Sequence, residues 1–236
     1  MTLSLQILER LVAFETVSNR SNLAIIAYIE DFLRSRGFRT EQILDPEEPK
    51  AGLYAEIGPS VDGALLLSAH SDVVPSEGQS WSVPPFKLTR RDDKLFGRGT
   101  TDMKGCLAEM LTLADVVHRR DLKAPLKLLV SYDEEIGCVG IARMKDRLPA
   151  LLGCPTLAIV GEPTEMQVGI GHKGKRAYRA DIRREAGHSA LAQQFVNALH
   201  VAVDFVEKLR HMQEAARQSG SRNAAYDVPY TTFHVG

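Results

Sequence analysis

ALLLSAHSD, at residues 64–72, is a short apolar run that passes directly into polar side chains. Two further runs have the same character: LKLLVS at residues 126–131 and TLAIV at residues 156–160. Runs of this length between polar residues or glycines are typical of buried strands in a parallel or mixed sheet. Residues 110–117, between two of the runs, have a helical pattern, and the resulting β-α-β alternation predicts an α/β fold.

The residues before this stretch predict two helices. The first is indicated by helical spacing of Ile7, Leu8, Leu11 and Val12. The second is expected after a cap at Ser21-Asn22, and its apolar face consists of Ile25, Ile26, Ile29, Phe32 and Leu33. Gly37 stands where a left-handed residue is expected to end that helix.

The pattern of the sequence changes near residue 172. Residues 176–184 alternate like a strand, and residues 231–236 resemble the start of another one. Between them we expect a long helix through Phe195, Leu199, Val203, Val206 and Leu209. The chain is therefore expected to divide into two domains, residues 1–172 and residues 173–236.

The composition indicates a globular protein and excludes several other classes. A hydrophobic content of 44% with 25% charged residues excludes a disordered chain. With 29 Lys+Arg against 30 Asp+Glu, the net charge of -1 argues against a general nucleic-acid binder. No apolar run is long enough to cross a bilayer, and Glu9 and Arg10 argue against a signal peptide, so no membrane association is expected. Three cysteines without a CxxC pair fit a reducing cytosol.

Side chains able to bind metals follow each predicted strand. His70 and Asp72 come after the first, residues 133–135 (Asp-Glu-Glu) after the second, and Glu162 after the third. A glycine-framed loop at residues 97–105 presents Asp102. Because sites form at the carboxyl ends of strands in open α/β sheets, these groups are expected to converge.

Each of these motifs also has a structural interpretation. His70-x-Asp72 alone is a weak signal, and three acids after a strand also suit a solvated turn. The glycine-rich loop fits neither the Walker pattern nor GxGxxG, and Lys104 within it is expected to be an ordinary surface charge. Taken together, His, Asp and Glu without Cys indicate a hydrolytic zinc-type site with one carboxylate free to act as a base.

Four motifs occur in a characteristic order: His70-x-Asp72-Val-Val-Pro, Gly97-Arg-Gly-x-x-Asp102-Met-Lys-Gly105, Asp133-Glu-Glu-x-Gly137 and Gly161-Glu-Pro-Thr164. In this order the chain resembles the di-metal amidohydrolases, the family that includes aminoacylase, succinyl-diaminopimelate desuccinylase and acetylornithine deacetylase. The resemblance implies a mixed-sheet α/β catalytic domain of the di-zinc aminopeptidase type over residues 1–172. It also implies the start of an α+β lid domain, which serves dimerisation, over residues 173–236.

The resemblance implies two divalent metal ions, zinc or cobalt, as cofactors. It makes Asp102 the bridge between them, with His70 and Glu135 on either side and Glu162 as a further terminal ligand. Asp72 would hold the His70 imidazole in its metal-binding tautomer.

The same resemblance implies catalytic roles for Glu134 and His188. Glu134 would be the general base that takes a proton from water and returns it to the leaving amine. His188, in Ala186-Gly-His-Ser-Ala190, matches the lid histidine that reaches the partner subunit's site and stabilises the tetrahedral oxyanion. A homodimer through the lid domain is therefore expected.

Within the family, residues 131–138 (SYDEEIGC) are most similar to the acetylornithine-hydrolysing members. The expected reaction converts N2-acetylornithine to ornithine and acetate, in cytoplasmic arginine biosynthesis. N-succinyl-diaminopimelate or another N-acyl-amino-acid or peptide substrate, and a truncated inactive binding remnant, are the alternatives. Family chains run further and take their fifth metal ligand, a histidine, from near the C-terminus. We therefore expect this chain to be truncated and that ligand to lie beyond residue 236.

Overall fold

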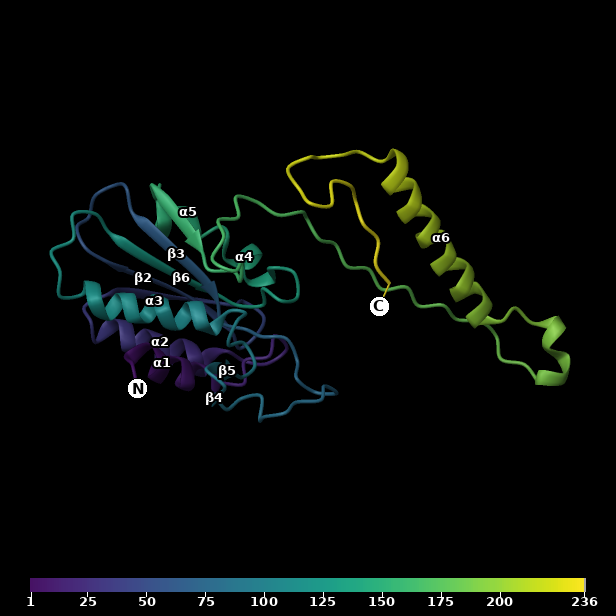
Figure 1. The fold of residues 1–236 in the computed structure, drawn as a ribbon, viewed down its shortest axis with the longest axis horizontal. Coiled ribbons are helices and arrows are strands. Elements are labelled where there is room, and N and C mark those ends of the chain that lie inside the picture. The colour runs from purple at the N-terminus through teal and green to yellow at the C-terminus, as the bar shows by residue number, and fades with distance from the viewer. Residues whose placement is uncertain (236) are drawn as a thin grey trace. The chain divides into compact units, whose positions relative to one another are not determined.

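The structure, a computed structural model, describes residues 1–235, which form two compact units (Figure 1). The first unit runs from Met1 to Val168, and the second starts at Gly169. This division lies close to the domain boundary expected after residue 172. All the strands and most of the helices belong to the first unit.

A five-stranded mixed sheet is the centre of the first unit, in the order β1-β2-β6-β3-β7. The strands are β1 (Arg39–Leu44), β2 (Ala51–Ile57), β3 (Leu65–His70), β6 (Leu126–Ser131) and β7 (Leu157–Val160). β3 runs parallel to β6 and β7, whereas β2 pairs antiparallel with β1 and β6. The three apolar runs are β3, β6 and β7, so the predicted mixed α/β fold is confirmed. β1 and β2 are additional to the predicted strands.

Three helices cover one face of this sheet: α1 (Leu3–Val12), α2 (Leu23–Arg34) and α3 (Lys104–Val117) (Figure 1). Their buried apolar residues form one core with the inward side chains of β2, β3 and β6. On α1 the buried positions are those that the spacing predicts, Ile7, Leu8, Leu11 and Val12. Burial of this kind is the main stabilising contribution to a fold, roughly 25 cal/mol per Å² of apolar surface.

The start of α2 is tied to the sheet through Asn22. This residue occupies the N-cap position, but its side chain bonds the backbone of Ala51. Its Nδ2 donates to Ala51 O at 2.8 Å, and its Oδ1 accepts from Ala51 N at 2.9 Å. After the helix, Gly37 adopts the predicted left-handed conformation, with φ of 79°. The predicted helix is therefore confirmed, and Asn22 in addition fixes it against β2.

Two short helices, α4 (Val139–Met144) and α5 (Leu148–Leu152), belong to a smaller apolar cluster around Tyr132 and Met144. Met144 fills the space above Gly52, where a Cβ atom would lie 2.1 Å from the Met144 Sδ. Both chain neighbours of Gly52 face the main core, so α4 lies on the opposite face of the sheet. Arg143 on α4 also pairs with the buried carboxylate of Asp45 at 2.6 Å, which fastens α4 to the β1–β2 turn.

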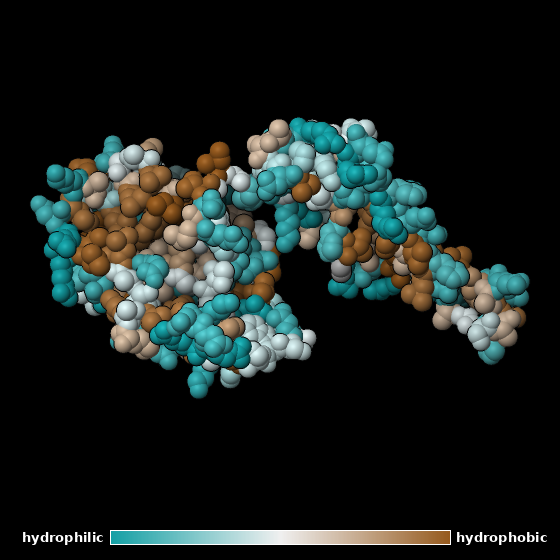
Figure 2. Space-filling view, in the orientation of Figure 1, coloured by the Kyte–Doolittle hydropathy of each residue, from teal (hydrophilic) through white to brown (hydrophobic). Residues whose placement is uncertain are grey.

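β7 is an edge strand of the sheet and is only partly covered. Leu157, Ile159 and Val160 are 55%, 48% and 60% exposed. Figure 2 shows apolar side chains gathered over the part of the first unit where the strands lie open to view in Figure 1. β7 therefore contributes backbone pairing to the sheet and little to its core. A separate hairpin of β4 (Thr89–Arg91) and β5 (Lys94–Phe96) completes the strands of this unit.

The second unit contains the 3-10 helix η1 (Ser189–Gln194) and the long helix α6 (Ala198–Ser219). α6 begins after Asn197, whose Oδ1 accepts from Leu199 N at 2.8 Å, so the expected helix is present but Phe195 lies outside it. Neither α6 nor any other helix of residues 1–235 is long and apolar enough to cross a bilayer.

The strands predicted at the C-terminal end are wrong as far as the structure describes them. Residues 176–184 and 231–235 contain no strand, and Gly236 lies outside the described residues. Alternation of side chains favours an extended backbone, but a strand also needs a neighbour for its hydrogen bonds. Residues 169–235 offer no such neighbour.

Replacing Leu107 by alanine tests the main core. Leu107 on α3 is fully buried, whereas Leu113 on the same helix is 36% exposed. We expect Leu107→Ala to lower the free energy of unfolding by about 2–5 kcal/mol, because the removed groups leave a cavity. Leu113→Ala should change it by no more than about 0.5 kcal/mol. Urea denaturation measures both values, and equal effects would contradict this assignment of the helix face.

Candidate metal centre

The carboxyl edge of the parallel strands gathers the side chains that can bind a metal. β3 ends at His70, Glu162 comes just after β7, and Asp102 lies just before α3. One ligand atom from each of these three residues lies within 4.8 Å of the other two. One imidazole with carboxylates is a donor set that catalytic zinc ions take in proteins. These residues therefore fit a divalent cation.

The His70 imidazole is fixed with one nitrogen towards the cluster. Its Nδ1 lies 2.9 Å from the backbone oxygen of Asp72 and 3.4 Å from Asp72 Oδ1. Its Nε2 lies 3.0 Å from Asp102 Oδ1. Burial lowers the pKa of His70, but the hydrogen bonds with Asp72 and Asp102 outweigh it and raise the pKa to about 9. With Nδ1 held by Asp72, Nε2 is the atom that faces a ligand.

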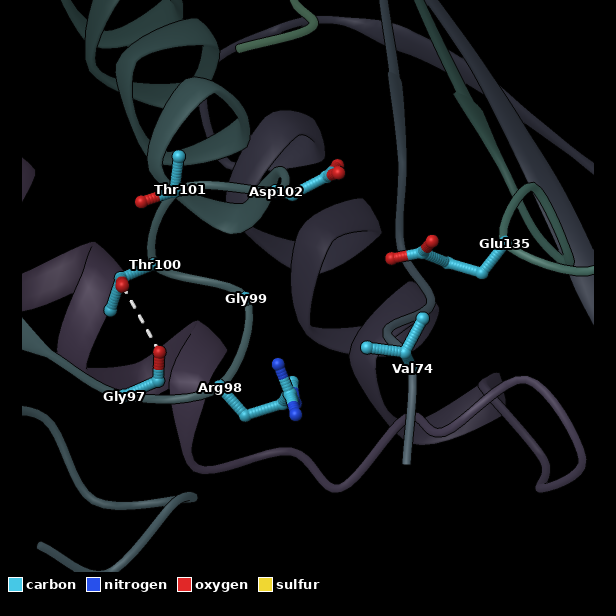
Figure 3. Close-up of a pocket in the computed structure, with 8 residues that line it drawn as sticks. All are labelled: Val74, Gly97, Arg98, Gly99, Thr100, Thr101, Asp102 and Glu135. Atoms are coloured by element: carbon cyan, nitrogen blue, oxygen red, sulfur yellow. Dashed lines mark hydrogen bonds between the residues drawn. The ribbon is translucent and has the colours of Figure 1, made fainter. Parts of the chain in front are cut away.

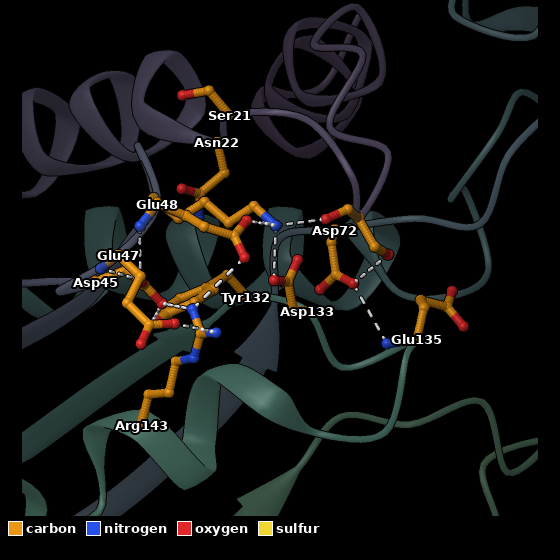
Figure 4. Close-up of polar contacts among 12 residues, drawn as sticks. Ser21, Asn22, Asp45, Glu47, Glu48, Asp72, Tyr132, Asp133, Glu135 and Arg143 are labelled. Atoms are coloured by element: carbon orange, nitrogen blue, oxygen red, sulfur yellow. Dashed lines mark hydrogen bonds and ion pairs between the residues drawn. The ribbon is translucent and has the colours of Figure 1, made fainter. Parts of the chain in front are cut away.

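The carboxylate of Asp72 is buried and accepts hydrogen bonds from several directions. Ser18 Oγ donates to its Oδ2 at 2.8 Å. The backbone N–H groups of Glu134 and Glu135 donate at 3.1 Å and 3.2 Å, the latter drawn in Figure 4. Burial raises the pKa of Asp72, but the hydrogen bonds from His70 and Ser18 outweigh it and lower the pKa. Asp72 therefore stays ionised and binds the loop that carries both glutamates.

Glu135 and Asp102 lie on opposite sides of a pocket lined by the loop of residues 97–102 (Figure 3). Burial and the nearby Asp102 carboxylate raise the pKa of Glu135. Glu134 lies beside them, with its Oε2 3.9 Å from His70 Nε2, and its Oε1 accepts from the Cys138 thiol at 3.3 Å. Carboxylates gathered in this way repel one another unless a cation neutralises them, which supports a metal at this pocket.

Glycines shape the loop that presents Asp102. Gly99 has φ of 80°, and its oxygen accepts from Lys104 N at 2.8 Å. A Cβ atom at Gly105 would lie 2.4 Å from Thr100 O, so the loop closes tightly on the start of α3. The peptide bond from Asp102 to Met103 is cis.

The expectation that Lys104 is an ordinary surface charge is wrong. The side chain is fully buried, and its Nζ donates to Phe14 O at 2.6 Å. Burial lowers the pKa of Lys104 to about 7, although the Asp72 carboxylate acts in the opposite direction. Lys104 therefore ties the start of α3 to the segment after α1.

Six of the seven predicted site residues lie together in the first unit: His70, Asp72, Asp102, Glu134, Glu135 and Glu162. His188 lies in the second unit, at the cap of η1, where its Nδ1 accepts from Ala190 N at 3.1 Å. Two residues that support the site, Ser18 and Lys50, are not predicted from the sequence. Ser18 donates to Asp72, and Lys50 donates to Asp133. Nothing in their local sequence distinguishes them from surface residues, because their partners are distant along the chain.

Asp72→Ala tests the support of this centre. We expect the affinity for Zn²⁺ to fall by roughly 10–100-fold, the usual effect of removing a residue that orients a metal ligand, here His70. Competition with a chelator measures the affinity, and Asp62→Ala, at an exposed position, is the control. Unchanged affinity in Asp72→Ala would place this residue outside the metal centre.

Known proteins are similar to this chain in sequence. The profile of peptidase family M20/M25/M40 matches residues 66–234. An acetylornithine deacetylase from Pasteurella multocida is 34% identical over 239 residues, which cover 98% of this chain and 61% of the relative. Another, from Shigella sonnei, is 35% identical over 225 residues, covering 95% and 57%. The chain thus spans about 60% of the length of these relatives.

Solved structures show the same similarity. An M20 family metallo-carboxypeptidase from Sulfolobus solfataricus aligns with a TM-score of 0.60 at 24% identity, over 68% of this chain and 37% of that one. Human carnosine dipeptidase 1 aligns with a TM-score of 0.56 at 25% identity, over 66% and 38%. The profile match covers more than half of the chain and includes all four motifs, so the chain belongs to peptidase family M20/M25/M40.

Proposed function

We propose that the protein is a metal-dependent amidohydrolase that cleaves N-acyl amino acids, with N2-acetylornithine as its substrate. The observation that carries this proposal is the convergence of His70, Asp102 and Glu162 within 4.8 Å, with Glu134 beside them. The choice of substrate is supported by two acetylornithine deacetylases that align with nearly the whole chain.

In this proposal the cofactors are two divalent ions, zinc or cobalt. Asp102 would be shared by both ions, a role that is supported by its carboxylate lying 3.0 Å from His70 and facing Glu135 across the pocket. His70 and Glu135 would each hold one of the ions, and Glu162 would be a further ligand. Ions held there would supply the polarisation of the amide carbonyl and would lower the pKa of water towards ~7.

Glu134 is proposed as the general base. Its Oε2 lies 3.9 Å from His70 Nε2, 34% of its side chain is accessible, and its backbone N–H donates to Asp72. Glu134 takes a proton from the attacking water and returns it to the amine nitrogen as the carbon–nitrogen bond breaks. The products are acetate and the free amine of ornithine.

We also propose the setting in which this reaction takes place. The second unit belongs to a lid domain, in which His188 stabilises the oxyanion in the partner subunit's site. Arginine biosynthesis in the cytoplasm is the proposed context, and three unpaired cysteines suit a reducing compartment.

Glu134→Gln tests the proposed base. In the full-length protein we expect hydrolysis of N-acetylornithine to fall by about 10²–10⁴-fold, because only the proton shuttle is removed. Release of ornithine and bound metal are measured on the same preparation, and metal content should be nearly unchanged. Glu77→Gln, at an exposed glutamate, is the matched control.

Two results would contradict the proposal. Most of the rate remaining in Glu134→Gln would exclude this residue as the base. Faster turnover of N-succinyl-diaminopimelate than of N-acetylornithine by the unmodified protein would exclude the proposed substrate.

A homodimer through the second unit is proposed from the surface of α6. Leu199 and Val203, one turn apart on this helix, are 73% and 64% exposed. Figure 2 shows apolar side chains gathered along this helix. Exposed apolar patches of this kind mark sites of association.

Val203→Asp tests this dimer. We expect the unmodified protein to have a dimer mass in light scattering at micromolar concentrations and Val203→Asp to be monomeric, because the contact would bury the new charge. Lys208→Asp, at an exposed position on the same helix, should leave the dimer intact. A monomer mass for the unmodified protein contradicts the proposed dimer.

A further inference from the structure

Lys50 is a buried lysine whose three ammonium hydrogens all have acceptors. It lies directly before β2, and only 3% of it is exposed. Its Nζ donates to Ser18 O at 2.5 Å, to Asp133 Oδ2 at 2.6 Å and to Glu48 Oε2 at 2.9 Å. Burial lowers the pKa of Lys50, but the hydrogen bonds that it donates to Asp133 and Glu48 outweigh it and raise the pKa.

Two of these acceptors belong to the segments that hold the Asp72 carboxylate. Ser18 donates through its own Oγ to Asp72 at 2.8 Å, and its backbone N–H bonds Val73 O at 3.2 Å. Asp133 directly precedes Glu134, whose N–H donates to Asp72 at 3.1 Å. Lys50 therefore joins, from behind, the same two segments that Asp72 joins from the front. Figure 4 shows Asp133 between Tyr132 and Asp72.

Asp133 has a backbone conformation that needs support. Its φ is 53°, in the left-handed region that residues other than glycine rarely adopt. The residue is only 2% exposed. Its oxygen accepts from Val139 N at 3.0 Å, so the turn that carries both glutamates starts from this residue. The conformation of Asp133 therefore sets the direction in which Glu134 leaves β6.

We propose that Lys50 is a positioning residue of the metal centre. By bonding Ser18 O and Asp133 Oδ2 at once, the Lys50 bridge holds the two segments at the separation that lets Asp72 accept from both. The N–H groups of Glu134 and Glu135 thereby keep their hydrogen bonds to Asp72, and both glutamates keep their positions relative to His70. This inference rests on the proposed function, since the centre it positions is the proposed metal site.

The alternative is that Lys50 only neutralises a buried carboxylate. The double variant Lys50→Met/Asp133→Asn separates the two cases, because it removes both charges together and also removes the bridge. If Lys50 positions the site, the double variant keeps a melting temperature near that of the unmodified protein but binds Zn²⁺ roughly 10–100-fold more weakly. If the double variant recovers the full Zn²⁺ affinity, the proposal is overturned.

The first measurement is hydrogen exchange of the metal-free full chain. We expect exchange at the backbone amides of Glu134 and Glu135 to be at least about tenfold faster in the double variant, because Asp72 no longer protects them. Arg36→Met is the control, since it breaks the ion pair with Asp115 (2.7 Å) on the helical face of the sheet. It should lower the melting temperature without changing exchange at these two amides.

The second measurement is Zn²⁺ affinity by chelator competition, at a temperature where every variant is folded. Single Lys50→Met and Asp133→Asn should weaken binding by similar factors, and the double variant by no more than either, because all three break one bridge. Additive losses, or unchanged exchange at Glu134 and Glu135, would overturn the proposal. If the unmodified protein binds no Zn²⁺, the proposed function fails, whereas the exchange data still decide whether Lys50 positions the two glutamates.

Discussion

The buried carboxylate of Asp72 is the interaction on which the rest of the site depends. A buried carboxylate without partners is costly, so the fold has to bring donors to both of its oxygens. They come from the segment after α1, through Ser18, from the end of β3, through His70, and from the loop after β6, through Glu134 and Glu135. Satisfying one anion therefore aligns three segments that are far apart in the sequence.

The charges around Asp72 alternate between acids and bases. Behind it lie Asp133 and Lys50, and in front of it lie His70 and the carboxylates of Asp102 and Glu135. With the pKa of His70 raised to about 9, the imidazole supplies the balancing positive charge at neutral pH. A metal ion requires a neutral imidazole, so the ion and the proton compete for Nε2. Binding of a cation therefore displaces this proton and takes over the neutralisation of the acids.

The parts of this site that the sequence predicts are those with a local signal. Three apolar runs that end in acids or imidazole are β3, β6 and β7, and their parallel pairing explains why the groups converge. β1 (RTEQIL) has no apolar run, because it lies at the other edge of the sheet with one neighbour. Lys104 and Lys50 look like surface lysines, since burial of a charge is decided by distant partners such as Phe14 O and Asp133. The wrong strand at residues 176–184 has the alternation of a strand without a neighbour to pair with.

The close seating of α4 on the sheet limits how the sequence can vary during evolution. Met144 leaves no room for a Cβ at Gly52, and a Cβ at Gly140 would lie 2.1 Å from Tyr132 O. α4 directly follows the turn that carries Glu134 and Glu135, so any residue that lifts α4 also displaces that turn. Gly52 is remote from the pocket in sequence, yet a larger residue there requires the Met144 side chain on α4 to shift. The contact at Gly140 is with a backbone oxygen, which no second substitution can make smaller, so Gly140 is the stricter of the two constraints and lies beside the turn of the site itself.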